Sequence, residues 1–239
     1  MKIFALALSC MLIFSAPARA SDVDLFNAML TLANKGDAEA QYHVGMMNNN
    51  GIGTRQNTRQ AYEWFQKSAS SSHPLGAYKL GCYFDGQGEG VVETNLDEAL
   101  KYKLVAAKAG YSLAQFDVAV HYARRDDFDE AVKWLQKAGE QGHDKALYGL
   151  YSSYHEGKGA PKDLSLAFAY FKLAHIASQK ELNADAEAVL NEMSAQMSDA
   201  EFEKAQKLVA EWKPQPTDLT LKALLGISAA EEYLQKKKQ

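Results

Sequence analysis

The sequence predicts an all-α fold, an α/α solenoid of antiparallel helix pairs that forms a right-handed superhelix. The basis is a unit of 32 to 38 residues that recurs four times. Three positions of the unit repeat in register: an aromatic in its first half, an alanine in its second half, and an Asn or Asp four residues before that alanine. Self-similarity at this period is typical of helical repeats, in which each unit buries its apolar faces against its neighbours.

The repeating positions define two helices in each unit. The first helix carries the aromatic, namely Tyr42, Tyr78, Phe116 and Tyr148. The second helix carries the alanine, namely Ala61, Ala99, Ala131 and Ala167. The Asn or Asp is a predicted N-cap of the second helix, because its side chain can accept hydrogen bonds from unpaired N–H groups; these residues are Asn57, Asn95, Asp127 and Asp163.

Residues 1–20 have the pattern of a signal peptide. An apolar run from Ile3 to Phe14 follows Lys2, and Ala18-Arg19-Ala20 fits the small-x-small cleavage rule. The run is too short to span a bilayer, which needs about 20 residues. A lipoprotein signal at Cys10 is the alternative, but Leu8-Ser9 before it is a poor match. We expect cleavage between Ala20 and Ser21, a periplasmic or secreted protein, and no stable membrane insertion afterwards.

Composition narrows the class of partner. The chain has 26 basic and 30 acidic residues and a net charge of −4, so no strong basic footprint for nucleic acid is present. Beyond the signal peptide the single cysteine is Cys82, which rules out an internal disulfide there.

The predicted domain order follows from the repeats. Residues 21–36 form an N-terminal capping helix, residues 37–180 the four repeats, and residues 181–212 a C-terminal capping helix pair with a capping box at Ser198 and Glu201. Pro214 and Pro216 end the helical region. Residues 213–239 form a tail with short helices, and whether it packs on the solenoid stays open.

The first unit also carries a family resemblance. Ala40-Gln41-Tyr42-x-Val44-Gly45, then Gly51-x-Gly53, then Ala61-x-x-Trp64-x-x-Lys67-x-Ala69 resembles the Sel-like repeat, a branch of the tetratricopeptide superfamily. The third unit departs from it, with Ala119 in a glycine position and no glycine in its loop at residues 124–127. The resemblance covers residues 22–212 and implies a non-catalytic scaffold for protein–protein interaction.

Motifs that would indicate a catalytic, phosphate-binding or metal-binding site are weak. Gly157-Lys158-Gly159 lacks the spacing of a phosphate-binding loop. The six histidines form no pair at metal-ligand spacing, and Cys82 has no activating base among its sequence neighbours. We therefore expect no catalytic residue, no metal and no cofactor.

The resemblance implies that the first helices line a concave groove. Positions i, i+4 and i+7 from each aromatic share one helical face. Tyrosines with polar neighbours are typical of recognition surfaces, although aromatics at this spacing are also typical of a core. The predicted groove residues are Tyr42, Met46, Asn49, Tyr78, Cys82, Asp85, Phe116, Tyr148, Ser152 and His155.

The leading functional hypothesis is an exported adaptor that binds a protein or peptide, such as an envelope protein or a secreted toxin. The resemblance offers an alternative, a periplasmic immunity protein that neutralises a type VI-secreted phospholipase. A cell-wall hydrolase or β-lactamase-like enzyme is less favoured. The β-lactam-linked branch of the family pairs cysteines within each repeat, and this chain has no such pairs.

Signal cleavage can be tested directly. We expect the exported protein to begin at Ser21, and intact-mass measurement of protein from the periplasm or medium checks this. An exported chain that still carries Lys2 would contradict it.

Overall fold

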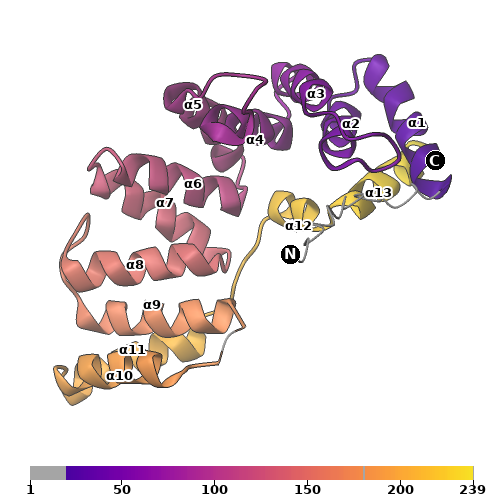
Figure 1. The fold of residues 1–239 in the computed structure, drawn as a ribbon. Helices are drawn as coiled ribbons and strands as arrows, with labels where there is room; N and C mark the ends of the chain where they lie inside the picture. The colour runs from indigo at the N-terminus through magenta and orange to yellow at the C-terminus, as the bar shows by residue number, and fades with distance from the viewer. Residues whose placement is uncertain (1–19, 180, 239) are drawn as a thin grey trace, which may run out of the picture.

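The computed structural model describes residues 20–179 and 181–238. Within these ranges every regular element is helical (Figure 1), which confirms the predicted all-α solenoid. Residues 1–19 of the predicted signal peptide, which spans residues 1–20, lie outside the described residues. Of the helices described, none is both long enough and apolar enough to cross a lipid bilayer.

The helices alternate between two layers along an arc. The first helices of the four repeats are α2 (Ala38–Asn50), α4 (Pro74–Cys82), α6 (Ser112–Ala123) and α8 (Asp144–Glu156). The second helices are α3 (Thr58–Ser70), α5 (Leu96–Lys108), α7 (Phe128–Glu140) and α9 (Leu164–Ala177). α1 (Ala20–Asn34) precedes them, and α10 (Ala184–Ala195), α11 (Asp199–Glu211), α12 (Asp218–Leu224) and α13 (Ile227–Lys238) follow. A π-helical turn, η1 (Tyr83–Gln87), extends α4.

Local sequence explains where the helices begin. All four predicted N-caps accept a hydrogen bond from a backbone N–H in the first turn of the second helix, which confirms their role. The third unit makes its short turn without glycine because Asp126 adopts a left-handed conformation, with φ of 59°. Aspartate tolerates this region better than most residues do.

Small residues set how closely paired helices approach. The four repeat alanines, Ala61, Ala99, Ala131 and Ala167, are all buried. A Cβ at Gly45 would lie 2.5 Å from the ring of Phe65, and one at Gly81 would lie 2.9 Å from Cγ of Lys103. Glycine therefore allows α2 and α4 to pack directly on large side chains of α3 and α5.

The C-terminal end of the repeats is covered by α10 and α11. Phe168 and Phe171 of α9 pack with Leu190 and Met193 of α10 and with Ala205 of α11 in one buried cluster. The capping box predicted at Ser198 and Glu201 is present at the start of α11. The pair thus shields the last apolar face of the solenoid.

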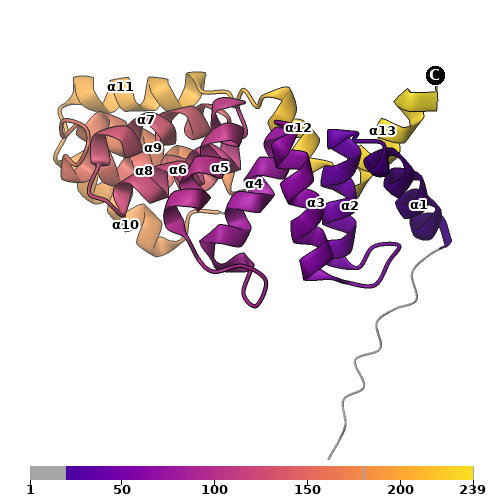
Figure 2. The same cartoon turned by 90° about the horizontal axis from the view of Figure 1, so that it is seen from above.

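The tail, residues 213–238, runs back across the opening of the arc. Figures 1 and 2 show α12 and α13 connecting the α11 end to α1. Ala230 of α13 is fully buried in a cluster with Leu25, Met29 and Val44 from α1 and α2. The open question of whether the tail packs on the solenoid is therefore answered: it bridges both ends.

Ionic contacts fix the far end of the tail. One oxygen of the Glu39 carboxylate lies 2.9 Å from Nε2 of His43, and the other lies 3.0 Å from Nε2 of His73 and contacts Nζ of Lys222 in α12. In the same region, Tyr233 of α13 donates its hydroxyl to Asp37 at 2.7 Å. Burial raises the pKa of Glu39, but the hydrogen bonds from His43, His73 and Lys222 outweigh burial and hold that pKa well below 4.5.

The close packing of the repeat alanines predicts that a charged side chain at one of these positions would strongly destabilise the fold. Ala61→Asp should lower the free energy of unfolding by about 3 kcal/mol or more, because the carboxylate would be buried without a partner. For a chain of this size that corresponds to a fall in Tm of roughly 6–12 °C. Gln60→Asp, at an exposed position of the same helix, is the matched control and should change Tm little. Equal melting of the two variants would contradict this packing.

The contacts of Glu39 predict an acid-sensitive tail. A depressed folded-state pKa adds stability that is complete above pH 4.5 and is lost as pH falls from there through the folded-state pKa. The hydrogen-exchange protection factors of α12 and α13, which are corrected for the pH dependence of intrinsic exchange, should therefore fall between about pH 4.5 and 3. Glu39→Gln should loosen the tail by roughly 2 kcal/mol at neutral pH and reduce this acid dependence. Glu63→Gln, on the exposed surface of α3, is the control. Identical pH profiles for wild type and Glu39→Gln would contradict the prediction.

Candidate partner-binding site

The predicted groove residues divide by burial, and three of them require a correction. Tyr42, Tyr78 and Cys82 are buried, with exposed fractions of 8%, 6% and 3%. They do not form an accessible surface, so their prediction as partner contacts is wrong for this structure. Replacing Tyr78 would test folding rather than binding.

Neighbouring units and the tail account for this burial. The ring of Tyr42 stacks on His73, with centroids 5.4 Å apart, and belongs to a cluster that includes Leu219 and Ala223 of α12. The ring of Tyr78 meets Tyr111 edge to face at 5.0 Å. Its hydroxyl donates to Asp117 at 3.1 Å.

The other predicted groove residues are at least partly accessible. Tyr148 is 51% exposed. The remaining members are half-buried; they are Met46, Asn49, Asp85, Phe116, Ser152 and His155. Of the predicted cleavage residues, Ala20 begins α1 and Ser21 is exposed in it.

Consecutive first helices meet through one recurring pair of positions. The position is counted from the repeat aromatic of each unit. The residue seven positions after the aromatic of one unit faces the residue five positions after the aromatic of the next unit. Between α2 and α4 this pair is Asn49 and Tyr83, and the Tyr83 hydroxyl donates to Asn49 at 2.8 Å and to the Thr58 carbonyl at 3.2 Å. The ring of Tyr83, which is 2% exposed, fills this junction.

The next junction is filled by charged groups. Here the pair is Asp85 and His121, with Nε2 of His121 3.3 Å from the Asp85 carboxylate but without hydrogen-bond alignment. Nζ of Lys103 lies between Asp85 and Asp117, 2.9 Å from the latter. Arg124 approaches Asp85 from solvent at 3.8 Å.

The third junction is not filled. The pair is Ala123 and Ser153, and neither side chain can bridge α6 and α8. An apolar pocket of about 280 Å³ opens there, floored by Ala131 and Leu135 of α7 and lined by Phe116 and Ser152 of the predicted groove. Its other lining residues are Ala119, Val120, Ala123, Phe128, Gly149, Ser153, Glu156 and Lys158. The volume is just below the ~300 Å³ typical of the smallest ligand sites, which suits a single large side chain.

Polar groups surround the pocket. Glu156 and Lys158 pair at 2.7 Å on one side, and Arg124 follows the lining residue Ala123 on the other. Tyr148 lies one turn before Ser152 on α8, and the Ser152 hydroxyl donates a hydrogen bond to the Tyr148 carbonyl at 3.4 Å. An apolar centre with a polar rim is the usual composition of a protein interface.

The charged junction holds the Lys103 amine and the neighbouring Cys82 thiol in their protonated forms. Burial lowers the pKa of Lys103, but Asp85 and Asp117 outweigh burial and raise it above 10.5, so the amine stays protonated. Burial and the charge of Lys103 lower the pKa of His121. Burial also raises the pKa of Cys82. A protonated lysine and a neutral thiol are poor nucleophiles, so neither side chain is activated in this junction.

Sequence reasoning missed Lys103, although a signal was present. The position four residues after the repeat alanine holds Phe65, Leu135 and Phe171 in the other units, and all three are buried. Lysine at a core position requires compensating carboxylates, and Asp85 and Asp117 supply them. Comparing the units position by position would have found this cluster.

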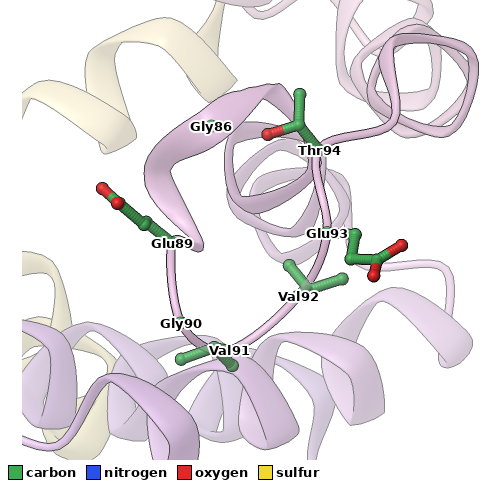
Figure 3. Close-up of a pocket in the computed structure, with 7 residues that line it drawn as sticks. All are labelled: Gly86, Glu89, Gly90, Val91, Val92, Glu93 and Thr94. Carbon is green, nitrogen blue, oxygen red and sulfur yellow. The ribbon is translucent and has the colours of Figure 1, made fainter.

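A second hollow lies in the loop after η1. Figure 3 shows it enclosed by one segment, with lining residues Gly86, Glu89, Gly90, Val91, Val92, Glu93 and Thr94. Glu89 and Glu93 point to opposite sides, so their carboxylates do not converge on a ligand. In the described ranges no three His, Cys, Asp or Glu side chains are placed to hold a metal ion.

Comparison with known proteins gives a family match. The family model of the Sel1 repeat matches residues 38–73, 74–111, 112–143 and 145–174. A putative sel1-like repeat-containing protein of Acanthamoeba polyphaga mimivirus is 30% identical over 134 residues, which are 55% of this chain and 24% of that protein. The chain thus spans about a quarter of that relative's length.

One solved structure matches this chain at the level of the fold. The Sel1 repeat protein from Oxalobacter formigenes has a TM-score of 0.63 at 25% identity, covering 72% of this chain and 49% of that one. An immunity protein from Pseudomonas aeruginosa has a TM-score of 0.36 at 14% identity, covering 68% of this chain and 84% of that one.

Proposed function

We propose, from the premise that this chain belongs to the Sel1 repeat family, that it is an exported, non-catalytic scaffold that binds a segment of a protein partner on its first helices. The observation that carries the proposal is the unfilled junction between α6 and α8. An apolar side chain of the partner would enter this pocket, and Tyr148 would add exposed aromatic contact area beside it.

Repeat geometry supports a role in binding for the pocket. The two preceding junctions show that the fold can close this position, either with a tyrosine or with an ion cluster. Small residues on both walls, Ala119 and Ala123 on one and Gly149 and Ser153 on the other, leave it open. An anchor side chain in such a pocket is the usual centre of a binding hot spot.

The partner belongs to the compartment that a cleaved signal peptide would give, so an envelope protein or a secreted toxin fits the proposal. An enzymatic role is disfavoured because the buried cluster around Lys103 holds its amine protonated and its thiol neutral.

Filling the pocket tests the proposal. Ser153→Tyr places at α8 the residue type that Tyr83 supplies at the first junction, and should leave Tm unchanged or raise it. A photo-crosslinker at Ser152 in the otherwise wild-type chain should trap one partner from periplasmic extract. We expect Ser153→Tyr to reduce that crosslink at least tenfold, the effect of losing ~1.4 kcal/mol or more from an anchor contact. Lys133→Asp, at an exposed position of α7, is the control. Undiminished crosslinking in a folded Ser153→Tyr variant would refute the pocket's role.

A further inference from the structure

The tail leaves an apolar face exposed. Leu221 and Leu224 of α12, and Leu225 directly after it, are 48%, 77% and 44% exposed. The opposite side of α12 is packed, since Thr220 is buried and Leu219 contacts a buried cluster of the first two repeats. A helix that is apolar on all sides is usually covered on all sides. In the described part of the chain, the second side of α12 has no such cover.

α13 continues this face. One side of α13 packs on α1 and α2 through Ala230 and Leu234. The other side follows the helical spacing i, i+3, i+4 and i+7 from Ala229. Together the two helices line a hollow of about 590 Å³, and its lining residues are Asp218, Leu221, Lys222, Leu224, Leu225, Ala229, Glu232, Tyr233 and Lys236. A contiguous exposed apolar patch with a polar rim is typical of an interaction surface.

The charges around the hollow are balanced. Asp218 and Glu232 supply two carboxylates, and Lys222 and Lys236 supply two amines. Lys222 contacts Glu39, whereas the other three have no ion-pair partner among the described residues. An anionic lipid surface or a nucleic acid would favour an excess of amines. Equal numbers of both signs instead allow this face to pair with a copy of itself.

The spacing of two of these charges suits a twofold contact. Glu232 and Lys236 lie one turn apart on the exposed side of α13. In a twofold interface, residue i of one copy meets residue j of the other, and j meets i. An antiparallel pair of α13 helices with the twofold axis between them would therefore bring Glu232 of each copy to Lys236 of the other.

We propose that the exposed face of α12 and α13 is the interface of a homodimer. Leu224, the most exposed of its leucines, enters the hollow of the other copy, and the same contact is made in reverse. The apolar residues form the centre and the charged residues the rim, as is usual in a protein interface. The tail is already fixed by its contacts with Gly110 and Glu39, so this face costs little to order. It is separate from the pocket between α6 and α8, so the dimer presents two such pockets.

Light scattering coupled to size-exclusion chromatography, run over a concentration series of the exported chain, tests the proposal. The wild-type chain should reach twice the molar mass of the monomer as its concentration rises through the micromolar range. Leu224→Ser should weaken dimerisation roughly tenfold or more, because each copy loses an apolar contact. Its Tm should stay unchanged, because the side chain is 77% exposed in the monomer. Leu208→Ser, at a leucine of α11 that is 37% exposed, is the matched control and should dimerise like wild type.

Exchange of the two charges tests the twofold pairing. Glu232→Lys or Lys236→Glu alone would place like charges opposite each other, so each should weaken dimerisation. The double variant with both changes should restore it, because the crossed pairs form again with their signs reversed. Ser153→Tyr should dimerise like wild type, which separates this result from the test of the α6–α8 pocket.

Four outcomes would overturn the proposal. The first is a wild-type chain that stays monomeric at every concentration. The second is a dimer that folded Leu224→Ser does not weaken. The third is a charge-exchanged double variant that dimerises as weakly as the two single variants. The fourth is a monomeric chain that floats with phosphatidylglycerol vesicles unless Leu224 is changed to serine, because the occupant of the face would then be a lipid surface.

Discussion

The structure depends on close packing of each first helix against a large side chain of the second helix in the same unit, and in the first two units a glycine makes this contact possible. Gly45 lies against Phe65, and Gly81 against Lys103, at distances that leave no room for a Cβ. These contacts keep the helix axes close, so each pair buries its apolar faces against the next pair. In the fourth unit the contact becomes aromatic, with Tyr151 meeting Phe171 edge to face at 4.9 Å. The spacing of the first helices, and hence every junction between them, follows from these contacts.

With the spacing fixed, the character of each junction is decided by very few side chains. A tyrosine closes the first junction, and a lysine with two carboxylates closes the second. At the third, Ala123 and Ser153 are too short, and an apolar pocket remains. A repeat fold can vary in this way because its backbone is held by the small-to-large contacts and not by the junction residues.

The four helical repeats could be predicted from the sequence because the residues that produce them recur at regular intervals. Alanine, aromatic and N-cap recur at fixed positions, and the helices begin where those positions require. The tail could not be placed, because its contacts are single hydrogen bonds and ion pairs, such as Thr217 to Gly110 and Lys222 to Glu39, that leave no pattern in the chain. The packing of the tail also explains why Tyr42 was wrongly predicted to be accessible, since residues of α12 cover it. The spacing of residues along a helix cannot distinguish a covered tyrosine from one that lines a groove. Phe116 and Ser152, which were predicted as groove residues, line the pocket between α6 and α8, and their contact with a partner stays a prediction.

The tail changes how the repeats cooperate. In an open solenoid each repeat contacts only its neighbours, so local unfolding at one end has little effect on distant repeats. Here one segment bonds to the turns at Gln141 and Gly110 and reaches Glu39 and Asp37 near the other end. The arc between these points cannot open without breaking tail contacts. Ion pairs on an exposed surface would add little to this constraint, because solvent screens them. The carboxylate of Glu39 is only 11% exposed, however, and it contacts His43, His73 and Lys222. The curvature that positions the α6–α8 pocket is therefore held from both ends, so the proposed partner would meet a preformed surface that costs little to order.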